Sequence, residues 1–172
     1  MDPYEGFNEF VNARLGPLSR TAYLLTGDHH AAEDLLQVAL SRVASRWPQV
    51  RDGHPDAYVR RTMINELTSW RRRRSYHERA TAAVDAGATA ADPAHAVVRR
   101  VVVAQALARL TPRQRAVLVL RFYDDLSESD TAEALGCSIG TVKSQTHLAL
   151  ARIREAAPEL HQLINETREV IA

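Results

Sequence analysis

Apolar side chains recur every three or four residues along most of the chain, and no stretch alternates strictly between apolar and polar positions. Such spacing gathers the apolar residues on one face of a helix, so it predicts an all-α protein. The first such stretch covers residues 4–26, and its apolar face consists of Phe7, Phe10, Val11, Leu15, Leu18, Ala22 and Leu25. Because proline lacks the N–H that a helix interior needs, Gly16-Pro17 is expected to divide this stretch into two helices.

Two further helices are predicted before residue 80. One runs from about His29 to Trp47, with an apolar face made of Ala32, Leu35, Leu36, Ala39, Val43 and Trp47. After a polar loop from Pro48 to Pro55, the next runs from Asp56 to about Tyr76, and its core stripe is Val59, Met63, Leu67 and Trp70. His29 and His30 are adjacent and therefore diverge on a helix, which favours a solvated helix start over a metal site.

The composition changes sharply between Thr81 and Ala96. This stretch is mostly Ala, Asp, Thr and Gly with Pro93, and it holds few large apolar residues. It cannot form a core by itself, so it is expected to be a flexible linker. We therefore predict two small helical domains, at residues 1–77 and 96–172, with the linker at 78–95.

The second domain is expected to contain four helices. The first ends near Leu110, and Thr111-Pro112 then provides an N-cap followed by proline at the first helical position of a helix that reaches Asp124. The other two helices lie between Leu126 and about Arg154. After Pro158, the spacing of apolar residues predicts a short amphipathic tail that covers this bundle (Leu160, Leu163, Ile164 and Ile171).

Residues 126–145 read as a short helix, a tight turn and a second helix. Ser127 can cap the first helix together with Asp130, and Ser138 can cap the second. Gly136 stands where a helix ends in a left-handed conformation. Two helices joined by a glycine-containing turn of this length form the helix-turn-helix unit that reads DNA. Agreement of both caps with the turn favours that unit over an ordinary helical hairpin with a solvated face.

The second of these helices has two distinct faces. Its inward positions are Ile139, Val142, Thr146, Ala149, Leu150 and Ile153, and its outward positions are Gly140, Thr141, Ser144, His147, Leu148 and Ala151. Lys143, Gln145, Arg152 and Arg154 flank the outward face. Small and polar groups between cations suit a helix in a major groove, where Lys143 and Arg152 would neutralise phosphates.

A net charge of +1 conceals a strongly basic middle of the chain. Between Arg42 and Arg79, ten arginines stand against four acidic residues, a local net charge of +6 (ten minus four). Beside its core stripe, the helix predicted there carries a second stripe, Tyr58, Thr62, Asn65, Ser69 and Arg72, and it ends in Arg71–Arg74. This stripe combines an aromatic ring, hydrogen-bonding groups and cations, which favours a nucleic-acid surface over a solvated basic run.

Several classes of function are not supported by the sequence. Cys137 is the only cysteine, so neither an internal disulfide nor a cysteine-cluster zinc site can form. No phosphate-binding glycine loop, metal cluster or nucleophile with an arranged base is evident, so we expect no enzymatic activity, cofactor or metal. With no signal-peptide pattern and no apolar run of about 20 residues, a soluble cytoplasmic protein is expected.

The order of these features resembles that of bacterial extracytoplasmic-function (ECF) sigma factors, the two-domain initiation subunits of RNA polymerase in the sigma-70 family, in particular actinobacterial SigE-type members. Residues 32–37 (AEDLLQ) resemble the family's helix that docks on the polymerase clamp. Residues 56–67 (DAYVRRTMINEL) resemble the segment that captures the −10 promoter element. Residues 110–115 (LTPRQR) and 140–144 (GTVKS) resemble the family's −35 reader.

The resemblance implies roles for individual residues. Asn65 matches the position that holds the flipped −10 base, and Tyr58 with the arginines would hold the unpaired strand. The residues implied at the −10 element are Tyr58, Arg61, Thr62, Asn65, Ser69, Arg72 and Arg73. Those implied at the −35 duplex are Gly140, Thr141, Lys143, Ser144, Gln145, His147, Leu148 and Arg152. Those implied in binding core polymerase are Asp34, Leu35, Gln37, Val38 and Arg42.

The implied partners are core RNA polymerase and promoter DNA. Sigma factors of this kind are commonly held inactive by an anti-sigma factor, although no residue here specifies one. Three positions depart from the family pattern, which usually has glutamate at Val38 and arginine at Gln145 and Leu148. These departures bear on affinity and promoter choice, because Gln145 can read adenine and Leu148 can meet a thymine methyl.

Two other interpretations explain part of the chain. A helix-turn-helix regulator that binds DNA without polymerase accounts for residues 97–154 but leaves the Asn65 stripe without a role. A helical adaptor whose basic helix binds RNA or an acidic protein accounts for the middle of the chain alone. The sigma-factor interpretation covers both halves.

Overall fold

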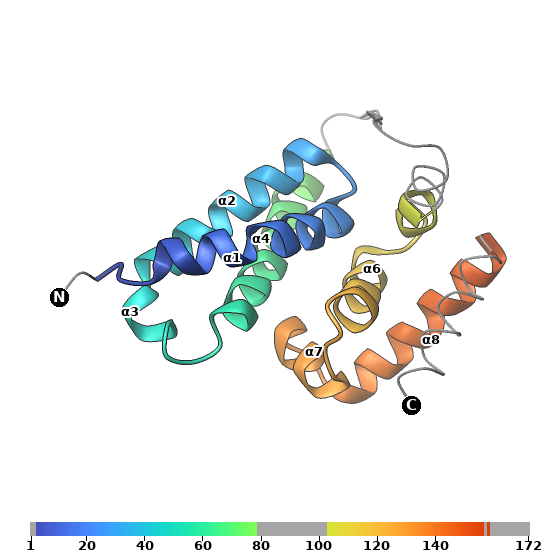
Figure 1. Cartoon of the computed structure of the whole chain (residues 1–172). Coiled ribbons are helices and arrows are strands. Elements are labelled where there is room, and N and C mark those ends of the chain that lie inside the picture. Colours follow the sequence, from blue (N-terminus) through green and yellow to red (C-terminus); the bar gives the residue numbers. More distant parts are fainter. Residues whose placement is uncertain (1–2, 79–102, 157, 159–172) are drawn as a thin grey trace, which may run out of the picture. The chain divides into compact units, whose positions relative to one another are not determined.

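The computed structural model describes residues 3–78, 103–156 and 158 of the 172-residue chain. Every regular element in these residues is helical, which confirms the all-α prediction (Figure 1). The chain forms two compact units that divide between Gly87 and Ala88. The amphipathic tail expected after Pro158 lies outside the described residues, and the exact domain bounds remain predictions.

The first unit packs three long helices and one short one around a single core. These are α1 (Phe7–Thr26), α2 (His29–Ser45), α3 (Trp47–Val50) and α4 (Pro55–Glu78) (Figure 1). Gly27 ends α1 in a left-handed conformation with φ 77°, and the carboxylate of Asp28 then caps α2 by accepting from the Ala31 N–H. The core is formed by Leu18, Ala22, Ala32, Leu35, Leu36, Ala39, Val43, Trp47, Val59 and Met63. Leu67 and Trp70 pack against it, as the core stripe predicts.

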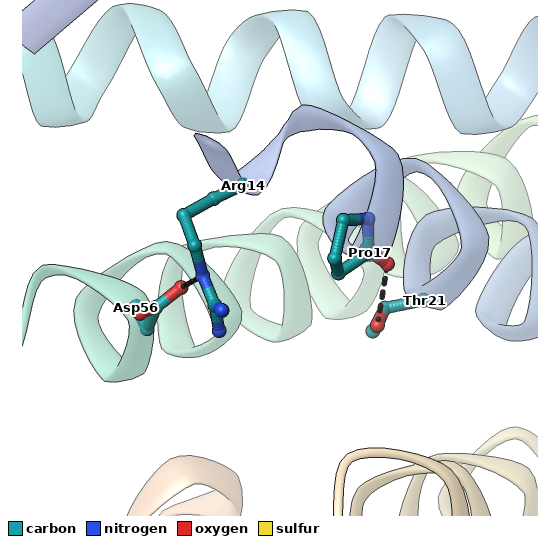
Figure 2. Close-up of polar contacts among 4 residues, drawn as sticks. All are labelled: Arg14, Pro17, Thr21 and Asp56. Atoms are coloured by element: carbon teal, nitrogen blue, oxygen red, sulfur yellow. Dashed lines mark hydrogen bonds and ion pairs between the residues drawn. The ribbon is translucent and has the colours of Figure 1, made fainter. Parts of the chain in front are cut away.

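The expected break at Gly16-Pro17 was wrong, because α1 continues through both residues. Proline leaves the carbonyl of the residue four positions earlier, Ala13, without its helical donor. Ala13 is exposed, so water can take the place of that donor. The turn that follows is anchored by the buried Leu18 and Ala22, and the Thr21 hydroxyl donates to the Pro17 carbonyl at 3.2 Å (Figure 2). Packing on one face therefore outweighs one lost hydrogen bond on the other.

The predicted end of the second helix and the following loop also needed correction. Arg46 leaves helical geometry (φ −118°, ψ 11°), so α2 stops at Ser45 and α3 starts at Trp47, with Pro48 in its first turn. Trp47 is buried, and the Phe7 and Phe10 rings each lie 5.2 Å from it between centroids. Its indole N–H donates to the Glu5 carbonyl at 2.7 Å. Trp47 thus anchors the N-terminal segment, which requires the chain to turn at Arg46.

The second unit contains a helical segment at 103–108, α6 (Pro112–Leu118), α7 (Glu128–Leu135) and α8 (Ile139–Ala156). Thr111 caps α6 in a full capping box with Gln114, and α6 passes into a π-helical turn at Val119–Tyr123. The described part of this unit therefore holds the four helical stretches that were predicted. Its two core clusters comprise Ala106, Leu110, Leu118, Ala149, Leu150 and Ile153, and Val117, Ala132 and Val142.

The turn between α7 and α8 has the geometry that its sequence predicts. Ser127 accepts from the Asp130 N–H at 3.0 Å, and Ser138 accepts from the Thr141 N–H at 3.1 Å. Gly136 is left-handed at φ 60°, and its N–H donates to the Glu133 carbonyl while the Cys137 N–H donates to the Ala132 carbonyl. This pair of bonds is a Schellman motif. Cys137 packs against the Val117, Ala132 and Val142 cluster, so its role here is a small apolar contact.

Gly136 in the turn and Gly140 in the first turn of α8 provide a matched test of the turn. Gly136→Ala should lower the free energy of local opening of α7 and α8 by about 1 kcal/mol, because a Cβ disfavours the left-handed conformation. A Cβ at Gly136 would meet no atom within 4 Å, so the cost is conformational and not steric. Gly140→Ala, inside α8, should instead be neutral or stabilise by about 0.5 kcal/mol. Amide hydrogen exchange of the full chain measures both, and equal effects would contradict the assigned role of Gly136.

Candidate nucleic-acid and protein interfaces

The two faces of α8 largely match the predicted wheel. Val142, Ala149, Leu150 and Ile153 are buried, and Gly140, Ser144, His147 and Leu148 are exposed. Leu148 is 49% exposed, so the outward face includes an apolar side chain. Ile139 was predicted to face inward but is 44% exposed. It is the first residue of α8, and the apolar cluster beside the turn includes Leu135 and Cys137 but not Ile139.

The flanking cations of α8 have partners inside the second unit. The Lys143 ammonium lies 3.6 Å from the carboxylate of Glu128 in the first turn of α7, and both side chains are accessible to solvent. Arg152 donates to the side-chain oxygen of the buried Gln114 at 2.9 Å, which ties α8 to α6. Thr141 and Gln145 are half-buried. Arg152 therefore braces the domain as well as adding charge to it, a role that helical spacing alone did not reveal.

The second stripe of α4 is only partly available at the surface. Asn65 and Arg61 are exposed, and Tyr58 and Ser69 are half-buried. Thr62, which was expected in this stripe, is buried, and its hydroxyl donates to the Tyr58 carbonyl at 2.7 Å. Arg72 and Arg73 belong to α4, but their side chains lie outside the described residues. Thr62 thus supports the stripe from below, and Asn65 with Arg61 presents it.

The predicted polymerase-binding residues of α2 form an accessible strip with one exception. Asp34, Gln37 and Arg42 are exposed and Val38 is half-buried. Leu35 is fully buried in the core, so it cannot contact a partner directly. The spacing of apolar residues also placed Leu35 on the core face, and the structure confirms that place, so Leu35 is not part of the accessible strip.

Ion pairs among the described residues join α4 to each of the other long helices of the first unit, and the sequence did not reveal them. The Arg14 guanidinium of α1 lies 2.6 Å from the Asp56 carboxylate in the first turn of α4, as Figure 2 shows. The Arg42 guanidinium of α2 lies 2.6 Å from the carboxylate of Glu66. Complementary charges are visible in the sequence, but their pairing depends on which helix faces meet. Glu66 and Glu128 are therefore additions to the candidate sites.

Other kinds of site find little support in the described residues. Within residues 3–78, 103–156 and 158, no group of three or more His, Cys, Asp or Glu side chains is arranged to hold a metal ion. His29 stacks on Tyr23, with ring centroids 4.4 Å apart. No helix in the same part of the chain is long and apolar enough to cross a membrane.

Comparisons with known proteins identify both halves of the chain. The Sigma-70 region 2 model matches residues 10–76, and the Sigma-70, region 4 model matches residues 100–153. An RNA polymerase sigma-E factor of Streptomyces avermitilis is 44% identical over 151 residues, which cover 87% of this chain and 83% of that protein. The ECF RNA polymerase sigma factor SigL of Mycobacterium tuberculosis is 31% identical over 148 residues, covering 83% of this chain and 84% of that protein.

A solved structure agrees with these sequence relatives. The sigma factor RpoE of Bartonella quintana, crystallised with the anti-sigma factor NepR, matches with a TM-score of 0.76 and 26% identity, over 89% of this chain and 97% of that one.

A helix-turn-helix regulator that acts without polymerase would leave the region 2 match over residues 10–76 unexplained. With region 2 and region 4 both present, and with relatives matched over most of their length, the chain belongs to the ECF sigma factors of the sigma-70 family, non-enzymatic subunits that bind core RNA polymerase and direct transcription initiation.

Proposed function

We propose that three surfaces of this sigma factor divide the work of initiation. The α2 strip (Asp34, Gln37, Val38 and Arg42) binds core polymerase, and the α4 stripe (Tyr58, Arg61, Asn65 and Ser69, continued by Arg72 and Arg73) captures the unpaired −10 strand. The outward face of α8 grips the −35 duplex. The observation that carries this proposal is the exposed amide of Asn65 beside the exposed Arg61, on a helix whose other side is core.

Asn65 has the chemistry that capture of a base requires. An amide offers both a donor and an acceptor, so it can pair with the edge of an extruded base. Extrusion costs a few kcal/mol of stacking and pairing, which contacts in the bound state must offset. The Tyr58 ring and the neighbouring arginines add stacking and phosphate neutralisation, the combination by which proteins hold single strands.

The outward face of α8 suits a duplex. Gly140 and Ser144 are small and exposed, so the helix can approach the groove closely. His147 and Leu148 project from the same face, where Leu148 supplies an apolar contact for a thymine methyl and Gln145 a bidentate partner for adenine. Lys143 exchanges its contact with Glu128 for a phosphate when DNA binds.

The cellular context follows from these roles. A protein that works on core polymerase and chromosomal promoters acts in the cytoplasm, which we propose as its location. The structurally similar RpoE was crystallised with an anti-sigma factor. We propose that an anti-sigma factor also holds the present sigma factor inactive.

Open-complex formation and core binding, measured separately, test the proposed role of Asn65. Holoenzyme made with the Asn65→Ala variant should lose open-complex formation at a cognate promoter. The affinity of the variant sigma factor for core polymerase should stay at the wild-type value, because the α2 strip is unchanged. Potassium permanganate footprinting detects the open complex, and competition for labelled core measures the affinity. Asn12→Ala, which removes an exposed amide from α1, is the matched control and should leave both unchanged. Loss of core affinity in Asn65→Ala would refute the assignment.

Salt dependence tests the −35 surface. Lys143→Ala should weaken binding to −35 duplexes of any sequence and reduce the slope of log affinity against log salt by about one. Lys143→Arg keeps the charge and should keep the slope. Glu128→Gln should strengthen binding to the −35 duplex, because Lys143 then gives up no ion pair with a carboxylate when it contacts a phosphate. An unchanged slope in Lys143→Ala would mean that this side chain faces away from the DNA.

A further inference from the structure

Glu66 is a buried acidic residue next to the proposed base-capturing Asn65. Its side chain is 5% exposed, and it lies one helical turn after Thr62 in α4. It is therefore too buried to contact DNA or polymerase itself. A carboxylate in such a position is costly unless a cation compensates it, and the residue that does so is Arg42 of α2, at 2.6 Å.

Arg42 differs from Glu66 in being accessible. Its side chain is 57% exposed although one end of the guanidinium is held by Glu66. It stands one helical turn after Val38 and two turns after Asp34, along the α2 strip. A free arginine side chain has many rotamers, and a partner that binds it must restrict them. An arginine already fixed by a buried carboxylate avoids most of that entropy loss, which is the general advantage of preorganisation.

The same contact joins the two working surfaces of the first unit. Arg42 belongs to the helix with the polymerase strip, and Glu66 belongs to the helix with the Asn65 stripe. The contact between the Arg42 guanidinium and the Glu66 carboxylate is charge-assisted, so it favours one relative position of the two helices. The pair also neutralises a carboxylate that would otherwise repel the DNA strand beside Asn65.

We propose that Glu66 is a positioning residue: it holds Arg42 in the orientation that core polymerase binds, and so couples the polymerase strip of α2 to the −10 stripe of α4. This inference rests on the proposed role of Arg42 and adds a second residue to it. Glu66 acts on polymerase only through Arg42.

A double-mutant cycle in the full-length protein tests this coupling. Arg42→Gln and Glu66→Gln should each weaken equilibrium binding to actinobacterial core polymerase, by about tenfold for the loss of one charge-assisted contact. The double variant should be no weaker than Arg42→Gln alone, because the two residues act as one unit. Glu66→Gln preserves side-chain shape, and the melting temperature of each variant is measured alongside.

The other ion pair on α4 supplies the matched control. Arg14→Gln breaks the contact with Asp56, which has the same 2.6 Å separation but joins α1 to α4 and involves no residue of α2. It should lower the melting temperature without changing core affinity. A second variant, Arg42→Lys, keeps the charge but loses the planar fork, and it should weaken core binding even if Glu66→Gln is too unstable to assay.

The outcomes separate the two levels of the proposal. Wild-type core affinity in Arg42→Gln would refute the role of Arg42 in the proposed function, and with it the coupling. Weakened Arg42→Gln beside wild-type affinity in Glu66→Gln or Arg42→Lys would leave that role intact but overturn the positioning by Glu66. Additive losses in the double variant, or an equal loss of core affinity in Arg14→Gln, would overturn it as well.

Discussion

The first unit depends on how α4 meets two incompatible requirements. One side of this helix completes the core through Val59 and Met63, and the adjacent side carries the polar stripe that we propose binds DNA. The transition takes place within one turn, where buried polar groups are unavoidable. The Thr62 hydroxyl donates a hydrogen bond to the Tyr58 carbonyl, and the Glu66 carboxylate forms an ion pair with Arg42. These local solutions let a helix rich in arginine pack at all.

The second unit meets a different requirement, which is the turn between the short helix α7 and the longer helix α8. Gly136 allows the chain to reverse at the end of α7 without strain, and two serine caps fix where each helix begins. The interior is then closed by a small cluster around Val117, Ala132 and Val142, with Cys137 beside it. Beside the inward side, α8 still contacts its neighbours through Arg152, which donates to Gln114, and through Lys143, which lies near Glu128. Leu148, by contrast, is exposed, so a different residue at this position should cost the fold little.

Local chemistry is the part of this structure that the sequence predicted well. Caps at Thr111, Ser127 and Ser138 and the left-handed Gly136 depend on neighbours within a few residues, so their patterns are readable. The errors at Pro17, Trp47 and Ile139 have another origin. Each depends on which side chains pack together in the folded unit: the packed turn after Pro17, the phenylalanines of α1 against Trp47, and the cluster that includes Leu135 and Cys137 but not Ile139.

The same distinction applies to the candidate sites. Helical spacing identified the stripe containing Asn65 and the outward face of α8, but not which members are accessible. Thr62 was expected in the exposed stripe and is buried, whereas the burial of Leu35 agrees with its place on the predicted apolar face. The acidic partners Glu66 and Glu128 carried no pattern of their own in the sequence, because an ion pair between helices is defined only when both helices are in place.

The proposed roles also explain why one chain carries both units. Capturing an extruded base is weak on its own, since unstacking and unpairing consume much of the contact energy. Binding of the −35 duplex by α8 requires no unstacking. Once that contact is made, the −10 strand is presented to the α4 stripe at the high effective concentration of an intramolecular partner. Core polymerase, bound through the α2 strip, supplies the fixed frame in which both contacts form together. Tighter binding at the −35 element then favours capture of the unpaired strand at the −10 element. A substitution that only weakens DNA binding by the α8 face should therefore slow promoter opening, although in this proposal no residue of α8 contacts the opened strand.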